Sequence, residues 1–260
     1  MSYSFADHTR ELAPWPEQPP GHMFALIDAA QLQPLKRPLK RMLDDGLSVL
    51  VFEDTFAKSA LDLSPVVLQL GGEAESFVRQ VTALDAACHH LPAMSILRSS
   101  LLIDELVQHL RSLMMIEADG TAYLLRFADS QMLAAANSIL MPTQRARFFK
   151  GISAWWTVDY HGHLHDQACA SDHEQVWPAI DLPLQLDAAQ TNALMTAVAV
   201  PVLASQVRNL DDGFARKLSH AEQMDFIHAC LVAAREEAWD ENEHLGLALQ
   251  RWQAVEEGRA

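Results

Sequence analysis

The pattern of hydrophobic and polar residues is most regular between Ser95 and Leu140. A short apolar run at 94–97 predicts a strand at its start. Six apolar residues then recur three and four positions apart and predict one face of an amphipathic helix: Ile103, Leu106, Val107, Leu110, Leu113 and Met114. Asp104 and Glu105 fall in the first turns of this helix, where the helix dipole favours negative charge.

After this helix the hydrophobic period changes to two. Residues 115–118 and 122–127 flank Asp119-Gly120, a pair that favours a tight hairpin turn because both positions tolerate positive φ. Asp129 is placed to cap a second helix through its side-chain oxygen, and Pro142 is expected to end that helix. The stretch therefore predicts a strand, a helix, a hairpin and a helix with short connections.

Strands and helices also alternate before and after this stretch. Apolar runs and helical spacings predict strands at 23–27, 47–52 and 66–70, helices at 32–43 and 77–88, and a hairpin of 152–160 with 164–168. This alternation predicts an α/β (α+β) fold, with a mixed sheet buried beneath helices in a lobe at 22–178. Four prolines predict that residues 1–21 form an extended N-terminal arm.

The pattern becomes wholly helical in the last part of the chain and predicts a smaller all-helical lobe at 184–260. Asp187 with Gln190, and Ser219 with Glu222, have the spacing of capping boxes. Pro201 is expected to kink or split the first of these helices. Residues 219–260 contain nine acidic and three basic side chains, so the outer faces of this lobe should be negative.

Composition narrows the possible partners and the location. Of the 260 residues, 19 are Lys or Arg and 34 are Asp or Glu, and a net charge of −15 argues against nucleic acid as a partner. The N-terminus lacks a signal-peptide pattern and no stretch is expected to reach transmembrane length. Cys88, Cys169 and Cys230 lack paired spacing, which favours reduced thiols. We therefore expect a cytoplasmic protein without membrane contact.

Ordered motifs between residues 22 and 160 carry a family resemblance. They are Phe24-Ala25-Leu26-Ile27-Asp28-Ala29-Ala30, Leu63-Ser64-Pro65-Val66-Val67-Leu68-Gln69-Leu70, His109-Leu110-Arg111, Asp119-Gly120, Leu125-Arg126-Phe127-Ala128-Asp129, and Phe148-Phe149-Lys150-Gly151-Ile152 with Trp155. Their order and spacing resemble the type VI secretion effector adaptor-chaperones, the Tap or Tec family. The chain departs at Ser130-Gln131, where that family usually has Pro-Arg, so a contact made by that Arg would differ here.

The resemblance implies a bacterial adaptor that acts by recognition, with no catalysis and no cofactor. Similar proteins bind a cognate toxic effector in the cytoplasm, keep it stable and load it onto the VgrG spike. The implied partners are therefore the effector and VgrG. One alternative to an adaptor is a purely structural subunit, which would assemble stoichiometrically with its partners and have no release step.

Arg126 and Asp129 are the first candidates for partner contact. Arg126 lies among apolar strand residues, and a partly buried guanidinium needs an acceptor, which Asp129 could supply. The pair would then lock the hairpin to the next helix, and direct partner contact is the alternative. Large aromatic side chains are the other candidates, because such residues form either core or interface: Trp156, Phe226, Trp239 and Trp252. Adjacent Trp155 and Trp156 should face opposite sides of their strand.

The rival hypothesis is a metal-dependent hydrolase. Alternate residues of a strand share a face, so His161, His163 and His165 could converge on a metal with Asp166, and Cys169 and His173 lie nearby. Gly162 interrupts this alternation and the spacing fits no known hydrolase pattern, so we expect no metal ligands. Cys88-His89-His90 is expected to be a helix end with a buried thiol instead of a nucleophile with its base.

Overall fold

The computed structural model describes residues 4–13, 21–32, 40–41, 44, 47–88, 91–168, 183–237, 239–240 and 243–258. The chain separates into two compact units, Ser2–Gln190 and Thr191–Ala260, which we describe one at a time. The first contains sheets and helices and the second is helical, which confirms the predicted α+β fold class. The predicted lobe boundary between 178 and 184 falls largely outside the described residues and stays a prediction.

A six-stranded antiparallel sheet forms the centre of the first unit, with strand order β2-β3-β1-β4-β7-β8. Its strands are β1 (His22–Ile27), β2 (Ser48–Leu50), β3 (Val66–Gln69), β4 (Met94–Ser99), β7 (Ile152–Val158) and β8 (Leu164–Asp166). Ala25 of β1 lies opposite Leu68 on one side and Ile96 on the other. These strands confirm the predicted ones, although β2 is shorter than expected.

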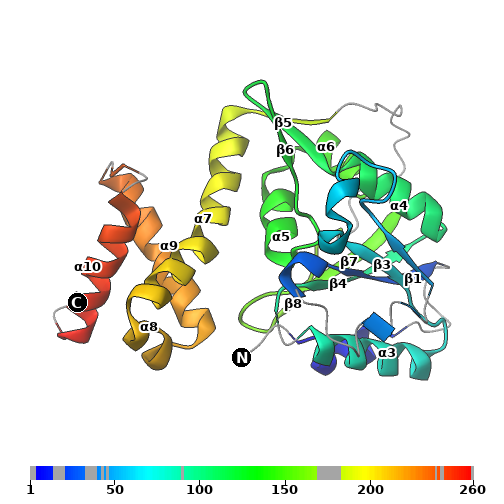
Figure 1. Ribbon diagram of the computed structural model, residues 1–260, viewed down its shortest axis with the longest axis horizontal. Coiled ribbons are helices and arrows are strands. Elements are labelled where there is room, and N and C mark those ends of the chain that lie inside the picture. Colours follow the sequence, from blue (N-terminus) through cyan, green and yellow to red (C-terminus); the bar gives the residue numbers. More distant parts are fainter. Residues whose placement is uncertain are drawn as a thin grey trace. The chain divides into compact units, whose positions relative to one another are not determined.

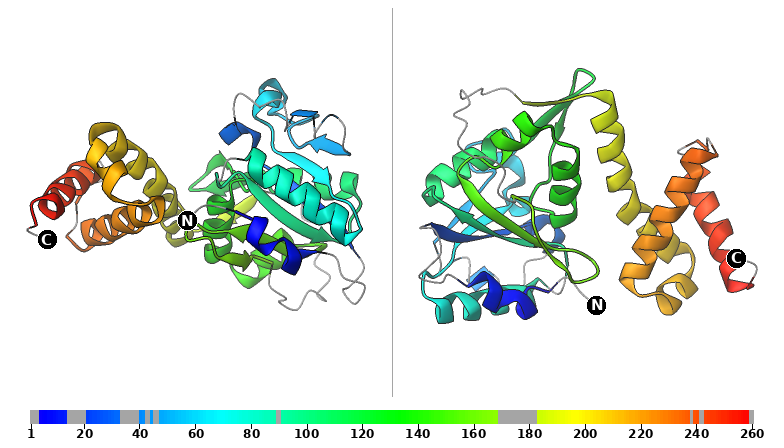
Figure 2. Two further views of the ribbon diagram at one scale, coloured as in Figure 1. Left: turned by 90° about the horizontal axis from the view of Figure 1, so that it is seen from below. Right: turned by 180° about the vertical axis from the view of Figure 1, so that it is seen from behind.

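One face of this sheet is covered by α3 (Ala74–Ala87) and two short N-terminal helices, η1 (Ala6–His8) and α1 (Thr9–Leu12) (Figures 1 and 2). Phe5 and Leu12 are buried in the same hydrophobic cluster as Phe77 of α3. The predicted extended arm is therefore wrong for residues 6–12, because apolar side chains anchor them to the core. The proline-rich residues 14–20 lie outside the described ranges.

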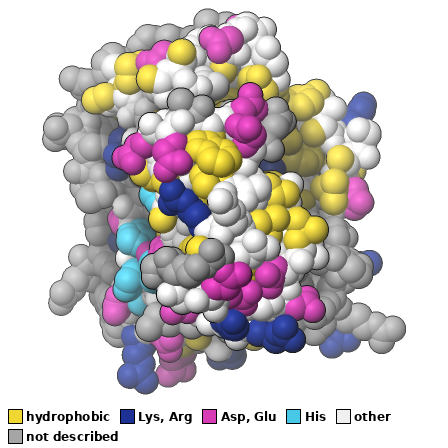
Figure 3. All heavy atoms as spheres, turned by 90° about the vertical axis from the view of Figure 1, so that its left-hand side faces the viewer, with side chains coloured by type: hydrophobic (Ala, Val, Ile, Leu, Met, Phe, Trp, Pro, Cys, Tyr) yellow, Lys and Arg dark blue, Asp and Glu magenta, His cyan; other side chains and the backbone are white. Residues whose placement is uncertain are grey.

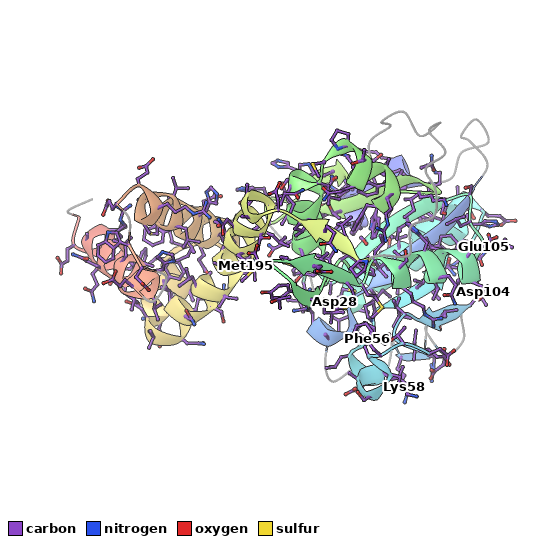
Figure 4. The ribbon with its side chains drawn as sticks, turned by 90° about the horizontal axis from the view of Figure 1, so that it is seen from above. Asp28, Phe56, Lys58, Asp104, Glu105 and Met195 are labelled. Carbon is purple, nitrogen blue, oxygen red and sulfur yellow. The ribbon has the colours of Figure 1, made fainter. Side chains whose placement is uncertain are left out.

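The opposite face is covered by α4 (Ile103–Ser112), α5 (Ser130–Ile139) and α6 (Pro142–Phe148) (Figure 1). Asp104 and Glu105, labelled in Figure 4, lie in the first turn of α4 as predicted. The Glu105 carboxylate accepts a hydrogen bond from the Leu102 backbone N–H at 2.9 Å. Pro142 follows the end of α5 and begins α6, a helix that the sequence pattern did not predict.

A second, three-stranded sheet has the order β6-β5-β9, with β5 (Met115–Ala118), β6 (Thr121–Leu124) and β9 (Leu184–Leu186). Asp119 and Gly120 have φ values of 49° and 73°, which confirms the predicted hairpin turn. β9 pairs in parallel with β5, so the prediction of a wholly helical chain from residue 184 is wrong at its start. Three residues are too few for their alternation to predict a strand.

Two short 3-10 helices complete the first unit, η2 (Ala29–Leu32) and η3 (Lys58–Leu63). The helix predicted at 32–43 falls mostly outside the described residues.

The second unit contains most of α7 (Ala188–Leu210), followed by α8 (Asp212–Lys217), α9 (His220–Glu236) and α10 (His244–Glu256). Asp187 and Gln190 exchange backbone-to-side-chain hydrogen bonds at 3.0 and 2.8 Å, and Ser219 with Glu222 does the same. Both predicted capping boxes are therefore confirmed. The α7 helix continues through Pro201, so the helix is not split there, and the alternative of a kink stays a prediction.

Helix α7 has 23 residues and, by length and composition alone, could cross a membrane. The expectation that no stretch reaches this length is therefore wrong. A packed helix of a soluble protein can meet the same criteria, and Leu203, Ala204 and Val207 of α7 are buried.

Trp155 on β7 fills the centre of the first unit. It is fully buried and its indole N–H donates to Ser95 Oγ at 2.8 Å. Phe148 stacks on it at a centroid distance of 6.0 Å, while Phe127 and Phe149 meet it edge to face. Its neighbour Trp156 points to the other face and is only partly buried there, as predicted.

We expect Trp155→Ala to lower the free energy of unfolding by about 3–5 kcal/mol, because it opens a large cavity and leaves Ser95 without its donor. Urea unfolding measures the change. Trp156→Ala is the matched control and should cost clearly less. Equal losses for the two variants would contradict the central role of Trp155.

Candidate functional site

Two segments of the family-like pattern meet at an ion pair. Arg126 Nη2 donates to Asp28 Oδ2 at 2.8 Å, across 98 residues of sequence. The Asp28 side chain is only 4% exposed, whereas that of Arg126 is 50% exposed. The guanidinium thus neutralises a buried carboxylate and keeps one side towards solvent. This arrangement corrects the prediction that Asp129 is the acceptor.

Asp28 follows β1 directly and joins several elements (Figure 4). Its carboxylate also accepts from the Ala30 backbone N–H at 3.1 Å and from the Gln31 side chain at 3.2 Å. Its backbone N–H donates to the Ala93 carbonyl, next to the start of β4, at 2.8 Å. Because a buried carboxylate needs several donors, Asp28 holds these segments in one arrangement.

Asp129 is the N-cap of α5, as predicted. Its Oδ1 accepts from the backbone N–H groups of Gln131 and Met132 at 3.0 and 3.3 Å. Burial raises the pKa of Asp129 to about 6, and the nearby Asp28 carboxylate adds to this effect, while the two amides and Arg126 act against it. Asp129 therefore faces its own helix and is not positioned as an exposed contact.

The His109-Leu110-Arg111 motif also makes internal contacts. His109 Nε2 lies 2.9 Å from the Phe148 carbonyl, and burial lowers the pKa of the imidazole, so its neutral N–H donates. Arg111 donates from Nε and Nη2 to the carbonyls of Val51 and Leu50 at 2.9 and 3.2 Å. These carbonyls belong to the edge strand β2 and the residue after it, so Arg111 covers part of an exposed sheet edge.

The aromatic candidates occupy different environments. Trp252 is buried at the centre of the second unit, where Phe214 and Phe226 meet it edge to face at 5.2 and 5.9 Å. Phe226 is only partly buried, as is Trp239, whose indole N–H donates to Glu237 at 2.9 Å. Trp156 in the first unit lies under the Arg98 guanidinium at 5.0 Å. Trp252 is therefore core, while Phe226, Trp239 and Trp156 retain exposed surface.

Helices α9 and α10 border a groove of about 310 Å³ in the second unit, lined by Phe226, Ala229, Cys230, Arg251, Ala254 and Val255. Arg251 at its edge pairs with Glu237 at 3.1 Å. Val255, which lines this groove, is 44% exposed. Figure 3, which faces the side on which α10 lies in Figure 1, shows acidic side chains beside apolar ones.

A second segment with exposed apolar side chains was not predicted from sequence. The segment 47–63 exposes Leu47, Phe56, Leu61 and Leu63, with Phe56 at 66% (Figure 4). The periodic pattern could not identify it because the segment contains only a three-residue strand and a short 3-10 helix.

The structure does not bring His161, His163, His165 and Asp166 together as one ligand set, which the rival hydrolase hypothesis required. Asp166 accepts from the backbone N–H groups of Trp155 and Ala168, both at 3.0 Å. His163 and His165 instead approach Asp159, a residue that the sequence pattern did not single out. Cys169 and His173 lie outside the described residues.

Cys88 ends α3 and is buried, as predicted. Burial raises the pKa of its thiol to about 12, with a smaller contribution from Asp85, so the thiolate is disfavoured at neutral pH. Its sequence neighbours His89 and His90 lie outside the described residues. Cys88 and Cys230 are both free thiols, which fits the expectation of reduced cysteines.

Part of the first unit matches a known protein family. Residues 23–147 match the model of a family described as a domain of unknown function (DUF4123). The matched range begins in β1 and ends in α6, so it includes both partners of the Arg126–Asp28 ion pair. No curated protein and no solved structure matches the chain.

Arg126→Ala removes the cation that neutralises Asp28. The pair is buried on one side only, so we expect the free energy of unfolding to fall by about 1–2 kcal/mol, between the values typical of exposed and buried pairs. A double-mutant cycle with Asp28→Asn should show a coupling energy above about 0.5 kcal/mol in urea unfolding. Unchanged stability with loss of partner binding would instead make Arg126 a contact residue.

Asp129→Asn keeps a capping oxygen but cannot ionise. Folding raises the Asp129 pKa from 3.8 to about 6, so the folded protein binds a proton that the unfolded chain releases in this range. The contribution of Asp129 to stability is therefore present below about pH 4 and is lost as the pH rises through about 6. As the pH rises from about 4 to about 7, the free energy of unfolding of the variant should increase by on the order of 1–3 kcal/mol relative to that of wild type.

Urea unfolding of both proteins at about pH 4 and about pH 7 measures this change in relative stability. A stability difference between the two proteins that does not change with pH would contradict the raised pKa.

Proposed function

We propose that this chain is a cytoplasmic bacterial adaptor-chaperone that binds a cognate type VI secretion effector, stabilises it and loads it onto the VgrG spike. The observation that carries the proposal is the DUF4123 match over residues 23–147. This range contains nearly all of the ordered motifs that resemble the Tap or Tec adaptors. The protein would act by recognition, without a catalytic step of its own.

The contacts of the motif residues suggest how this function is divided within the chain. His109 and Arg111 bind backbone carbonyls, Asp129 caps a helix, and Arg126 neutralises Asp28. Four side chains of the family-like pattern thus stabilise the fold of the first unit. Recognition of one particular effector would then depend on exposed residues outside this pattern.

The groove between α9 and α10 is the surface that we assign to the effector. It lies beyond the residues matched by the family model, so it is free to differ between relatives that serve different effectors. It is lined mainly by apolar side chains, and the segment 219–260 that contains it has nine acidic and three basic residues. Its charge and lining suit an effector helix or strand that carries apolar residues beside basic ones.

The test is co-expression of the full chain with the toxin and the spike protein encoded beside its gene. We expect the toxin to copurify with the wild-type chain. Ala229→Arg should reduce the recovered toxin at least about tenfold, because a long cationic side chain would fill the groove and repel a basic segment. Ala229 is exposed, so the folded state should tolerate this change.

Ala193→Arg is the matched control, since Ala193 is also an exposed helical alanine but does not line the groove. It should leave toxin recovery unchanged. Full binding by Ala229→Arg would move the effector site to another surface. Absence of toxin and spike genes beside this gene, together with no copurifying partner, would contradict the adaptor function itself.

A further inference from the structure

The hairpin between β7 and β8 brings a carboxylate and two imidazoles together. Asp159 Oδ2 lies 2.8 Å from His165 Nε2 and 3.4 Å from His163 Nδ1. The three ligand atoms all lie within 4.8 Å of one another. His163 sits in the turn and His165 on β8, opposite Thr157 of β7. Residues two apart along the chain therefore direct their rings to one carboxylate oxygen.

The carboxylate is held in place by the backbone of the turn. Asp159 Oδ1 accepts from the N–H groups of His161 and His163, both at 2.9 Å. Since Oδ1 is occupied by amides, Oδ2 is the oxygen available to a further ligand.

The turn itself is anchored at both ends. Gly162 has a φ of 87°, a conformation that side chains rarely adopt, and its N–H donates to the Asp159 carbonyl at 3.0 Å. The Asp159 N–H donates to the His163 carbonyl, also at 3.0 Å. His8, from the N-terminal helix η1, approaches the Gly162 carbonyl at 3.0 Å. The ligand atoms are therefore carried by a fixed turn and not by a loose loop.

We propose that Asp159, His163 and His165 bind a Zn²⁺ ion at the surface of the first unit. Zinc prefers imidazole nitrogen and carboxylate oxygen at about 2.0–2.2 Å, so tetrahedral ligand atoms lie about 3.3 Å apart. The two spacings from Asp159, 2.8 and 3.4 Å, bracket this value. The two imidazole nitrogens lie within 4.8 Å of each other and would reach the ion by rotation of their rings. Three protein ligands leave a fourth position open.

This set differs from the one that the rival hydrolase hypothesis used, because Asp159 takes the place of Asp166 and His161 is not among the three ligands. Asp166 already accepts two backbone hydrogen bonds, at Trp155 and Ala168. The side chains of His163 and His165 are 70% and 49% exposed, so the ion would be easily reached from solvent. An enclosed hydrolase centre excludes water and shapes a substrate pocket, whereas an exposed site of this kind serves to hold the ion.

The experiment uses the full chain purified without a His tag and stripped of metal with a chelator. Titration of Zn²⁺ against a chromophoric competitor should show one ion bound per chain. His163→Ala and His165→Ala should each weaken binding at least tenfold. His228→Ala changes an exposed histidine on α9 and should leave the affinity unchanged.

Cobalt substitution gives a second readout that does not depend on stability. Co²⁺ bound in the wild-type chain should produce visible absorption bands that both hairpin variants lose. The idea is overturned if Zn²⁺ binding is absent, or if it persists in the double variant His163→Ala, His165→Ala while circular dichroism shows an intact fold. Binding lost equally with His228→Ala would also overturn it, by showing nonspecific histidine binding. None of these results bears on effector binding, so the zinc site and the adaptor function can be contradicted independently.

Discussion

The structure of the first unit depends on burial of β1 from both sides. Met23 through Ile27 are all buried, so the side chains on both faces of this part of the strand must meet apolar side chains. This requirement places α3 with the N-terminal helices on one face and α4, α5 and α6 on the other. A polar group at the end of such a strand cannot reach water freely, which explains why Asp28 is met by Arg126 and by a backbone amide.

The residues of the family-like motifs hold these packed elements together. Arg111 satisfies carbonyls at the β2 edge, His109 holds the end of α6, and Trp155 fills the space beneath it. Each of these residues contacts a partner that is far away in sequence, and the contact forms only because helices are packed over a single sheet. A fold stabilised in this way can tolerate exposed residues that differ from one relative to the next. This separation of fold-stabilising residues from exposed ones is consistent with the proposed adaptor function, in which relatives share the fold but each binds a different partner.

Sequence periodicity predicted the elements that carry many residues. The strands β1, β3 and β4, the helices α3, α4 and α9, and the turn at Asp119-Gly120 all follow from local spacing and turn chemistry. The missed features follow no hydrophobic period. Asp28 is the partner of Arg126 because tertiary packing brings the two side chains together across 98 residues of sequence. Asp159 lies only four and six residues from His163 and His165, but the irregular turn that brings these side chains together has no periodic pattern. The three-residue strand β9 is recognisable only through its partner β5.

The parallel pairing of β9 with β5 has a consequence for the meaning of the family match. The matched residues end at 147, before β7, β8 and β9. A fragment with these limits would lack Trp155 from its core, would expose the β4 edge, and would leave β5 paired on one side only. A cut at Pro183 would still remove β9. The recognisable domain is therefore shorter than the folding unit, whose strand pairing is complete only when β9 has been synthesised.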